Sequence, residues 1–363
     1  MLKGALGLHI TQREELGRRQ TALFRALAVL FALMMGALFL LILGYQPLAV
    51  YGTMLSGALG SAGMQKEVLK LTIPLALASL GVLLAFKMRF WNIGAEGQII
   101  MGAVAASYFA YFQPGLPRWA LLILMAISGI LAGGLWGLIP AWFKTRFGTN
   151  ETLFTLMLNY IALYLITYLR EGPWRDPSGG GFAAMPRFPK PARLPEVPFP
   201  FVGNVHIGWV VMLVMVAALF VYLKYTKQGY ELSVVGENER TARYAGMPVA
   251  KIVLRTMFIS AGVCGLAGML QVSGADRQLT DAIGGGRGFQ AVSVVWLARL
   301  NPFGALAVSF LFAVMQKGFS MMQTEYRIPA SMSDILQGII LFCVLGAEFF
   351  LQYRVMRRKE ALA

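Results

Sequence analysis

The chain has 363 residues, of which 57% are hydrophobic and 13% are charged, and its mean hydropathy is +0.63. A soluble domain carries roughly twice that charged fraction, so the composition excludes an ordinary soluble enzyme and predicts one membrane domain. The net charge of +15 does not indicate nucleic-acid binding, because the basic residues lie between apolar segments and form no stripe interleaved with aromatic residues.

In chain order, apolar segments able to enter a bilayer recur from residue 26 to residue 353. They cover residues 26–45, 68–86, 98–112, 119–143, 153–169, 207–225, 256–271, 289–300, 305–319 and 334–353. The sequence therefore predicts an all-α polytopic membrane protein of about ten transmembrane helices, with broken or re-entrant segments. The basic clusters between these segments all fall on one side of such a membrane. The positive-inside rule then predicts that both termini are cytoplasmic.

This pattern divides the chain into a cytoplasmic segment (1–25), a transmembrane domain (26–353) and a cytoplasmic tail (354–363). Two loops inside the transmembrane domain have different compositions. Residues 170–206 are rich in proline and are expected to form coil or short turns on the external face. Residues 226–255 carry mixed charges and are expected to hold one or two short amphipathic helices on the cytoplasmic side.

The polar patch Trp91-Asn92-Ile93-Gly94-Ala95-Glu96-Gly97-Gln98 lies between two apolar segments. Polar groups at membrane depth are costly, so Asn92, Glu96 and Gln98 are candidates for a translocation pathway. If the backbone is helical through the patch, Asn92 and Glu96 share a face and Gln98 points elsewhere. Alternatively, Glu96 only caps the start of a helix, where a carboxylate stabilises the free amides.

Two further segments carry polar residues at helical spacing. Glu151, Thr155 and Asn159 recur at steps of four along the fifth apolar segment, and Asp334 and Gln337 lie in the last one. Such residues either join membrane helices to one another or line a pathway.

Residues 289–300 would form a helix about 18 Å long, too short to cross a bilayer core of about 30 Å. Glycine-rich residues 284–288 precede this segment and Asn301-Pro302 follow it. The segment either extends through its neighbours or is re-entrant, as in a discontinuous helix.

The sequence lacks common nucleotide-binding and metal-binding motifs. It contains no phosphate-binding Gly-x-x-x-x-Gly-Lys-Ser/Thr loop and no His-Glu-x-x-His pair, and Cys264 and Cys343 lack metal-ligand spacing. We therefore expect no catalytic residue, no metal and no cofactor, and we expect that the chain does not itself hydrolyse ATP. Transport is the simpler interpretation.

Four blocks in order resemble the permease subunits of bacterial ATP-binding-cassette importers for branched-chain amino acids, simple sugars and nucleosides. They are Phe90 to Gln98, Asn150-Glu151 with Met157 to Ala162, Val235 to Asn238 with Ala242 and Tyr244 to Met247, and Gly285 to Phe289 ahead of Asn301 to Gly304. Within that class, Asn-Ile-Gly-Ala-Glu-Gly-Gln is similar to the nucleoside-type permeases. The chain departs from the family where Trp296-Leu297-Ala298-Arg299 replaces the usual Leu-Leu-Gly-Arg, so Trp296 joins the residues expected to shape the pathway.

The resemblance implies a multi-pass protein of the bacterial inner membrane, in contact with lipid. It implies a complex with a second permease subunit, identical or related, two ATP-binding subunits and an external substrate-binding protein. The substrate implied is a nucleoside, with a simple sugar such as ribose as the alternative.

The resemblance also implies that the loop from Gly236 to Gly246 is a coupling helix that docks on the ATPase. The residues expected to carry the coupling are Gly236, Glu237, Asn238, Ala242 and Gly246. A solvated amphipathic linker is the alternative for this loop.

From a different functional class, the chain could be an ion-coupled secondary transporter that works alone. Its carboxylates Glu96, Glu151 and Asp334 would then be ion or proton sites.

Overall fold

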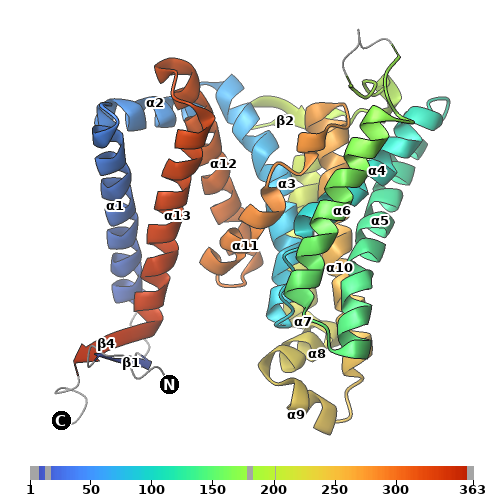
Figure 1. Cartoon of the computed structure of the whole chain (residues 1–363). Helices are drawn as coiled ribbons and strands as arrows, with labels where there is room; N and C mark the ends of the chain where they lie inside the picture. The colour runs from blue at the N-terminus through green and yellow to red at the C-terminus, as the bar shows by residue number, and fades with distance from the viewer. Residues whose placement is uncertain (1–7, 13–17, 178–182, 201, 358–363) are drawn as a thin grey trace. The chain divides into compact units, whose positions relative to one another are not determined.

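A computed structural model describes residues 8–12, 18–177, 183–200 and 202–357 (Figure 1). The chain forms two compact units, residues 1–60 with 315–363 and residues 61–314, which we describe separately. The N-terminal and C-terminal segments that the sequence assigns to residues 1–25 and 354–363 lie partly outside the described residues.

The first unit contains α1 (Arg18–Ile42), α2 (Pro47–Leu59), the second half of α12 (Pro302–Tyr326) and α13 (Ala330–Gln352). Ala32 and Leu40 of α1 pack with Phe319 of α12 and Leu336 of α13 in a buried apolar cluster. Two short strands, β1 (Leu8–Gln12) and β4 (Tyr353–Arg357), pair antiparallel, so these two strands lie side by side. The chain bends by 116° between α1 and α2.

The second unit is built around two helices, α3 (Ala62–Lys87) and α10 (Val249–Leu270). Most of the apolar length of both helices is buried inside the unit. Around them lie helices that expose far more of their apolar surface: α5 (Arg118–Phe147), α6 (Glu151–Glu171) and α7 (Gly208–Tyr225). Because apolar surface outside the core is stable in lipid, this distribution is typical of a membrane-embedded bundle.

Shorter elements complete the second unit. They are α4 (Ala95–Phe112), α8 (Lys227–Glu237), α9 (Glu239–Tyr244), α11 (Arg287–Leu297), a π-helix over Gln271–Asp276, 3-10 turns at Lys190–Ala192 and Asp281–Ile283, and strands β2 (Glu196–Phe199) and β3 (Gly203–His206). Strands β2 and β3 form an antiparallel hairpin with Glu196 opposite His206. The proline-rich loop therefore holds a hairpin and a 3-10 turn besides coil. Within residues 226–255, where one or two short helices are expected, the structure contains α8 and α9.

Seven helices in the described part of the chain are long and apolar enough to cross a membrane, or eight if the bent α1 and α2 form one span. This supports an all-α polytopic protein but not about ten transmembrane helices. Three expected segments account for the difference. Residues 26–45 belong to the bent pair, and residues 98–112 lie in α4, whose first turn carries polar Glu96 and Gln98. Residues 289–300 overlap the 11-residue α11 and extend three residues beyond its end.

Candidate functional site

The chain between α3 and α4 leaves the helical conformation over residues 88–94, and side chains of α6 satisfy its backbone. The Ile93 amide donates to Thr155 Oγ1 at 3.3 Å, and Asn159 Nδ2 donates to the Ile93 carbonyl at 2.9 Å. Thr155 and Asn159 lie about 6 and 12 Å along α6 from its first residue, at 1.5 Å per residue. The break therefore lies beside the first half of α6, a helix long and apolar enough to cross a membrane, and such irregular backbone is tolerated within a bilayer only if protein buries it or it lines a water-filled cavity.

Asn92 and Gln98 bind each other within this break. Asn92 Nδ2 donates to Gln98 Oε1 at 3.2 Å, Gln98 Nε2 donates to Asn92 Oδ1 at 3.1 Å, and the Gly94 amide also donates to Asn92 Oδ1. Both side chains are buried. The shared face expected for Asn92 and Glu96 required a helical backbone through the patch, and this condition is not met, because α4 begins only at Ala95.

Glu96 caps a helix other than its own. Its Oε1 accepts a hydrogen bond from the Gly286 amide at 2.8 Å, and its Oε2 accepts one from the Gly288 amide at 2.7 Å. These amides begin α11, so the carboxylate satisfies free donors and meets the positive end of the helix dipole. A Cβ at Gly288 would lie 2.1 Å from the Glu96 backbone nitrogen, so only glycine permits this approach.

A polar stripe on α6 faces the break. Glu151, Thr155 and Asn159 are all buried, as expected for residues spaced by four on one helix face. Asn159 Oδ1 accepts a hydrogen bond from the Gly97 amide at 2.8 Å, and Glu151 forms an ion pair with Lys144 at 2.6 Å. Thr155 and Asn159 therefore join α6 to the start of α4.

Trp296, at the end of α11, lies in an aromatic cluster with Trp91 of the break and Phe86 of α3. The ring centroids of Trp91 and Trp296 are 5.7 Å apart with an interplanar angle of 32°. Gln337 is partly exposed on α13 and belongs to the other compact unit. The structure thus brings together Asn92, Glu96, Gln98, Asn159 and Trp296 around one broken segment, with Glu151 at its edge.

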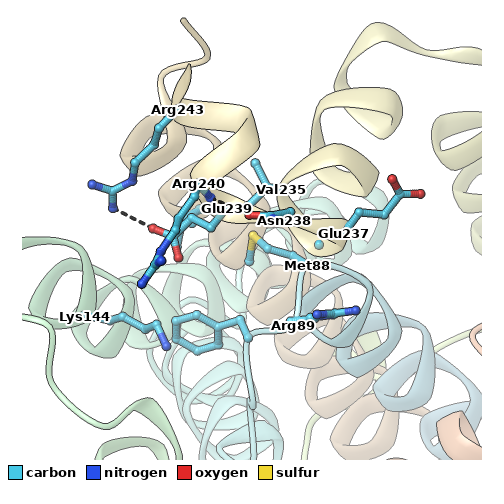
Figure 2. A pocket seen from close by; sticks show the side chains of 12 residues that line it. Met88, Arg89, Lys144, Val235, Glu237, Asn238, Glu239, Arg240 and Arg243 are labelled. Carbon is cyan, nitrogen blue, oxygen red and sulfur yellow. Dashed lines mark hydrogen bonds and ion pairs between the residues drawn. The ribbon is translucent and has the colours of Figure 1, made fainter. Parts of the chain in front are cut away.

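A groove of about 750 Å³ lies between the α3–α4 break and the helices α8 and α9 (Figure 2). We call it the α8–α9 groove. Its walls carry basic and acidic side chains, and one pair, Arg243 and Glu239, is joined at 2.6 Å. Lys144 lies over the Phe90 ring, 5.7 Å from its centroid. The residues lining the groove are Met88, Arg89, Phe90, Lys144, Val235, Gly236, Glu237, Asn238, Glu239, Arg240, Arg243 and Val253.

The residues expected to carry coupling have distinct positions in α8 and α9. A Cβ at Gly236 would lie 2.0 Å from the Lys87 carbonyl, so Gly236 lets α8 approach the end of α3. Asn238 caps α9 by accepting hydrogen bonds from the Arg240 and Thr241 amides, and Ala242 is the fully buried residue of α9. Gly246 follows α9 with a φ of +76°. Glu237 is exposed at the rim of the groove.

Sequence reasoning missed several residues of this site. Gly286 and Gly288 were part of a family block, but nothing in their spacing indicates that a carboxylate nearly 200 residues away binds their amides. Tyr244 was also part of a family block, but the sequence did not indicate that its side chain is 96% exposed at the end of α9. In the described part of the chain, no group of three or more His, Cys, Asp or Glu side chains is placed to hold a metal ion.

The family model for the branched-chain amino acid transport system permease component matches residues 64–345. The chain is 34% identical to a glucose ABC transporter permease protein of Haloferax volcanii, over 91% of this chain and 88% of the relative. It is 30% identical to a guanosine ABC transporter permease protein of Bacillus subtilis, over 88% of this chain and 92% of the relative. It is 26% identical to a nucleoside ABC transporter permease protein of Lactococcus lactis, over 93% of this chain and 94% of the relative.

Proposed function

The chain belongs to the permease family of the branched-chain amino acid transport system, and from this premise we propose that it forms half of a nucleoside pathway in an ATP-driven importer. Its relatives are ABC permease subunits, which are not enzymes themselves. Membership of this family implies partner ATPases and a substrate-binding protein. The proposed assembly has two permease subunits, two ATPases and one external binding protein in the cytoplasmic membrane.

The observation that carries the pathway is the broken segment at the start of α4. Transporters place substrate sites where helices are discontinuous, because the free ends of half-helices offer polar groups at membrane depth. Here the amides that begin α11 are bound by Glu96, and Asn92, Gln98 and Asn159 satisfy the break itself. These contacts favour a role in which Glu96 positions α11, with the substrate passing along the surface that α11 presents.

The nucleoside assignment is supported by two observations. The Asn92 to Gln98 block has the form found in nucleoside-type permeases, and two of the relatives described above are named for guanosine and nucleosides. The relative with the higher identity, 34%, is named for glucose, which favours a simple sugar as the second candidate.

Coupling is assigned to α8 and α9. Nearly all of α9 is exposed, Tyr244 most of all, and exposed aromatic residues are common anchors of protein interfaces. Gly236 holds α8 tightly against Lys87 at the end of α3, directly before the broken segment of residues 88–94. A partner that displaces α8 would therefore also move the end of α3 and the broken segment that follows it.

The test is reconstitution with the neighbouring genes of the operon. The purified complex is placed in liposomes, and ATPase activity is measured with the binding protein loaded in turn with nucleosides, ribose and glucose. Stimulation by nucleosides supports the proposal, and stimulation by sugars alone assigns the second candidate. Uptake by this chain alone, driven by an ion gradient and without ATPases, would instead establish a secondary transporter, for which Glu96, Glu151 and Asp334 are the candidate ion sites.

A further inference from the structure

Two indole rings stack on one surface of the second unit. Trp91 and Trp296 are 45% and 46% exposed, and their ring centroids are 5.7 Å apart. Phe86 lies beneath both rings, at 5.4 Å from Trp91 and 6.0 Å from Trp296, and is itself buried. The two indoles are thus fixed from one side, and each leaves close to half of its surface uncovered.

The uncovered surface continues along α11. Phe289, Ser293 and Trp296 follow one another at positions i, i+4 and i+7, so they share one face of the helix. Phe289 is 44% exposed, while Ser293 and the neighbouring Gln290 are partly exposed. The opposite face of α11, with Ala291, Val294 and Val295, is buried. The exposed face therefore mixes aromatic rings with a hydroxyl and an amide.

This composition does not suit a lipid-facing surface. An amide and a hydroxyl exposed to hydrocarbon would lose their hydrogen bonds to water at a cost of several kcal/mol. The helix is also only 11 residues long, and irregular segments precede it at residues 284–286 and follow it at residues 298–301. Such broken backbone is tolerated at membrane depth where it lines a water-filled cavity. Aromatic walls with a few polar groups are typical of sites for small molecules.

We propose that Trp91, Phe289, Gln290, Ser293 and Trp296 form a ring-stacking surface of the pathway, on which the flat nucleobase of the substrate lies against the indoles. This inference rests on the proposed function and adds the group of the substrate that the pathway contacts. Ser293 and Gln290 supply hydrogen bonds to the polar edge of the base. Stacking tolerates different bases because every base has an apolar face, so the surface suits a permease that leaves selection to its binding protein.

The geometry also indicates how the base is held. A ring inserted between the two indoles would need about 7 Å, twice a carbon contact of about 3.5 Å, which is more than their present 5.7 Å separation. The base therefore stacks on an outer indole face and is not held between the two rings.

Fluorine NMR of the intact complex tests the contact directly. The chain is labelled with 5-fluorotryptophan, and the resonances of Trp91, Trp296 and Trp142 are assigned with Trp→Phe variants. Trp142 is the matched control, because it is 49% exposed on α5. Adding guanosine or adenosine is expected to shift the Trp91 and Trp296 resonances through the ring current of the base and to leave Trp142 unmoved. Unmoved Trp91 and Trp296 resonances in a complex that transports nucleosides overturn the surface and leave the proposed function standing.

Uptake kinetics give a second, independent readout. Trp91→Leu and Trp296→Leu are each expected to lower nucleoside uptake about tenfold or more, because stacked bases lose that much when the ring is removed. Trp296→Phe retains a flat ring and is expected to stay within about threefold of wild type, and Trp142→Leu is expected to be unchanged. Wild-type uptake by both Leu variants overturns the proposal and assigns these indoles to lipid or to another subunit. A Leu variant that fails to assemble leaves the decision to the NMR of the wild-type chain.

Repeating the uptake and NMR measurements with glucose distinguishes failure of the proposed nucleoside function from failure of the stacking surface. If the complex transports glucose and no nucleoside, the proposed nucleoside function fails. Glucose-induced shifts at Trp91 and Trp296 would then show a sugar ring on the same indoles and overturn the nucleobase as the occupant. A lack of any shift would overturn the surface as well.

Discussion

Glu96 and Gly288 are 192 residues apart in sequence, yet Glu96 Oε2 accepts a hydrogen bond from the Gly288 amide at 2.7 Å. This contact ties the first turn of α4 to the first turn of α11. The Glu96 carboxylate therefore caps α11, and its negative charge stabilises the free amides at the N-terminus of that helix.

Glu96→Ala is expected to lower the free energy of unfolding by about 2–3 kcal/mol, because it leaves the Gly286 and Gly288 amides without their charged acceptor. Glu96→Gln keeps one acceptor oxygen and is expected to lose about half as much. Thermal or chemical unfolding in detergent measures both, with Glu67→Ala as a control at an exposed ion pair. Equal stability of all three variants would contradict the capping role.

Gly288→Ala is expected to destabilise the chain by about 1–3 kcal/mol or more and to lower uptake, because the added methyl would lie 2.1 Å from the Glu96 nitrogen and push α11 away. Gly338→Ala on α13 is the control, since a Cβ there meets nothing within 4 Å. The control is expected to be neutral or slightly stabilising. If Gly288→Ala unfolds at the same midpoint as the control, the close approach of α11 to Glu96 does not require glycine at position 288.

Asn159→Leu is expected to cost about 2–4 kcal/mol, because it leaves the buried Gly97 amide and Ile93 carbonyl without partners. Thr167→Val removes a side-chain hydrogen bond of the same helix at an exposed position and is expected to be neutral within about 0.5 kcal/mol. Unfolding in detergent compares the two. If Asn159→Leu lowers the free energy of unfolding as little as Thr167→Val does, water takes over the hydrogen bonds of the Asn159 side chain in the break.

Tyr244→Ala is expected to weaken ATPase copurification and uptake at least tenfold without changing the unfolding midpoint, because the ring is 96% exposed and packs on nothing within its own unit. The matched control is Tyr164→Ala, a tyrosine that is 70% exposed on α6. If both variants retain the ATPase and transport normally, α9 is a solvated linker and not a coupling helix.

His206 is expected to make stability depend on pH. Burial lowers the pKa of His206. The nearby positive charges of Lys70, Arg277 and Lys66 lower this pKa further, and the negative charge of Glu196 partly opposes them. Together these effects bring the pKa from 6.5 to about 4. Between these values the unfolded chain binds a proton that the folded chain does not, so stability is complete above about pH 6.5 and falls as the pH decreases. The loss is about 2 kcal/mol at pH 5 and approaches about 3 kcal/mol at pH 4.

Unfolding of wild type and His206→Leu at pH 7.5 and pH 5 measures this effect. The variant retains His9, so the difference between the two chains isolates His206. A pH dependence as steep in His206→Leu as in wild type would assign it to other groups.

The sequence by itself determined the elements that depend on local composition. Apolar length predicted α3, α5, α6, α7, α10, α12 and α13, and the shortness of residues 289–300 predicted a broken segment there. The spacing of Thr155 and Asn159 predicted a shared buried face, because a helix repeats every 3.6 residues wherever it forms. These features need no knowledge of neighbouring segments.

Only the tertiary structure decided which groups meet. The start of α4 at Ala95, and not before Asn92, turned Asn92 toward Gln98, since side-chain direction depends on where a helix begins. The partners of Glu96 lie nearly 200 residues away, and the stacking of Trp91 on Trp296 joins segments of similar separation. Hydrogen bonds and ring contacts act over a few ångströms in space, so no local pattern specifies them, and packing of the complete helices brings their partners together.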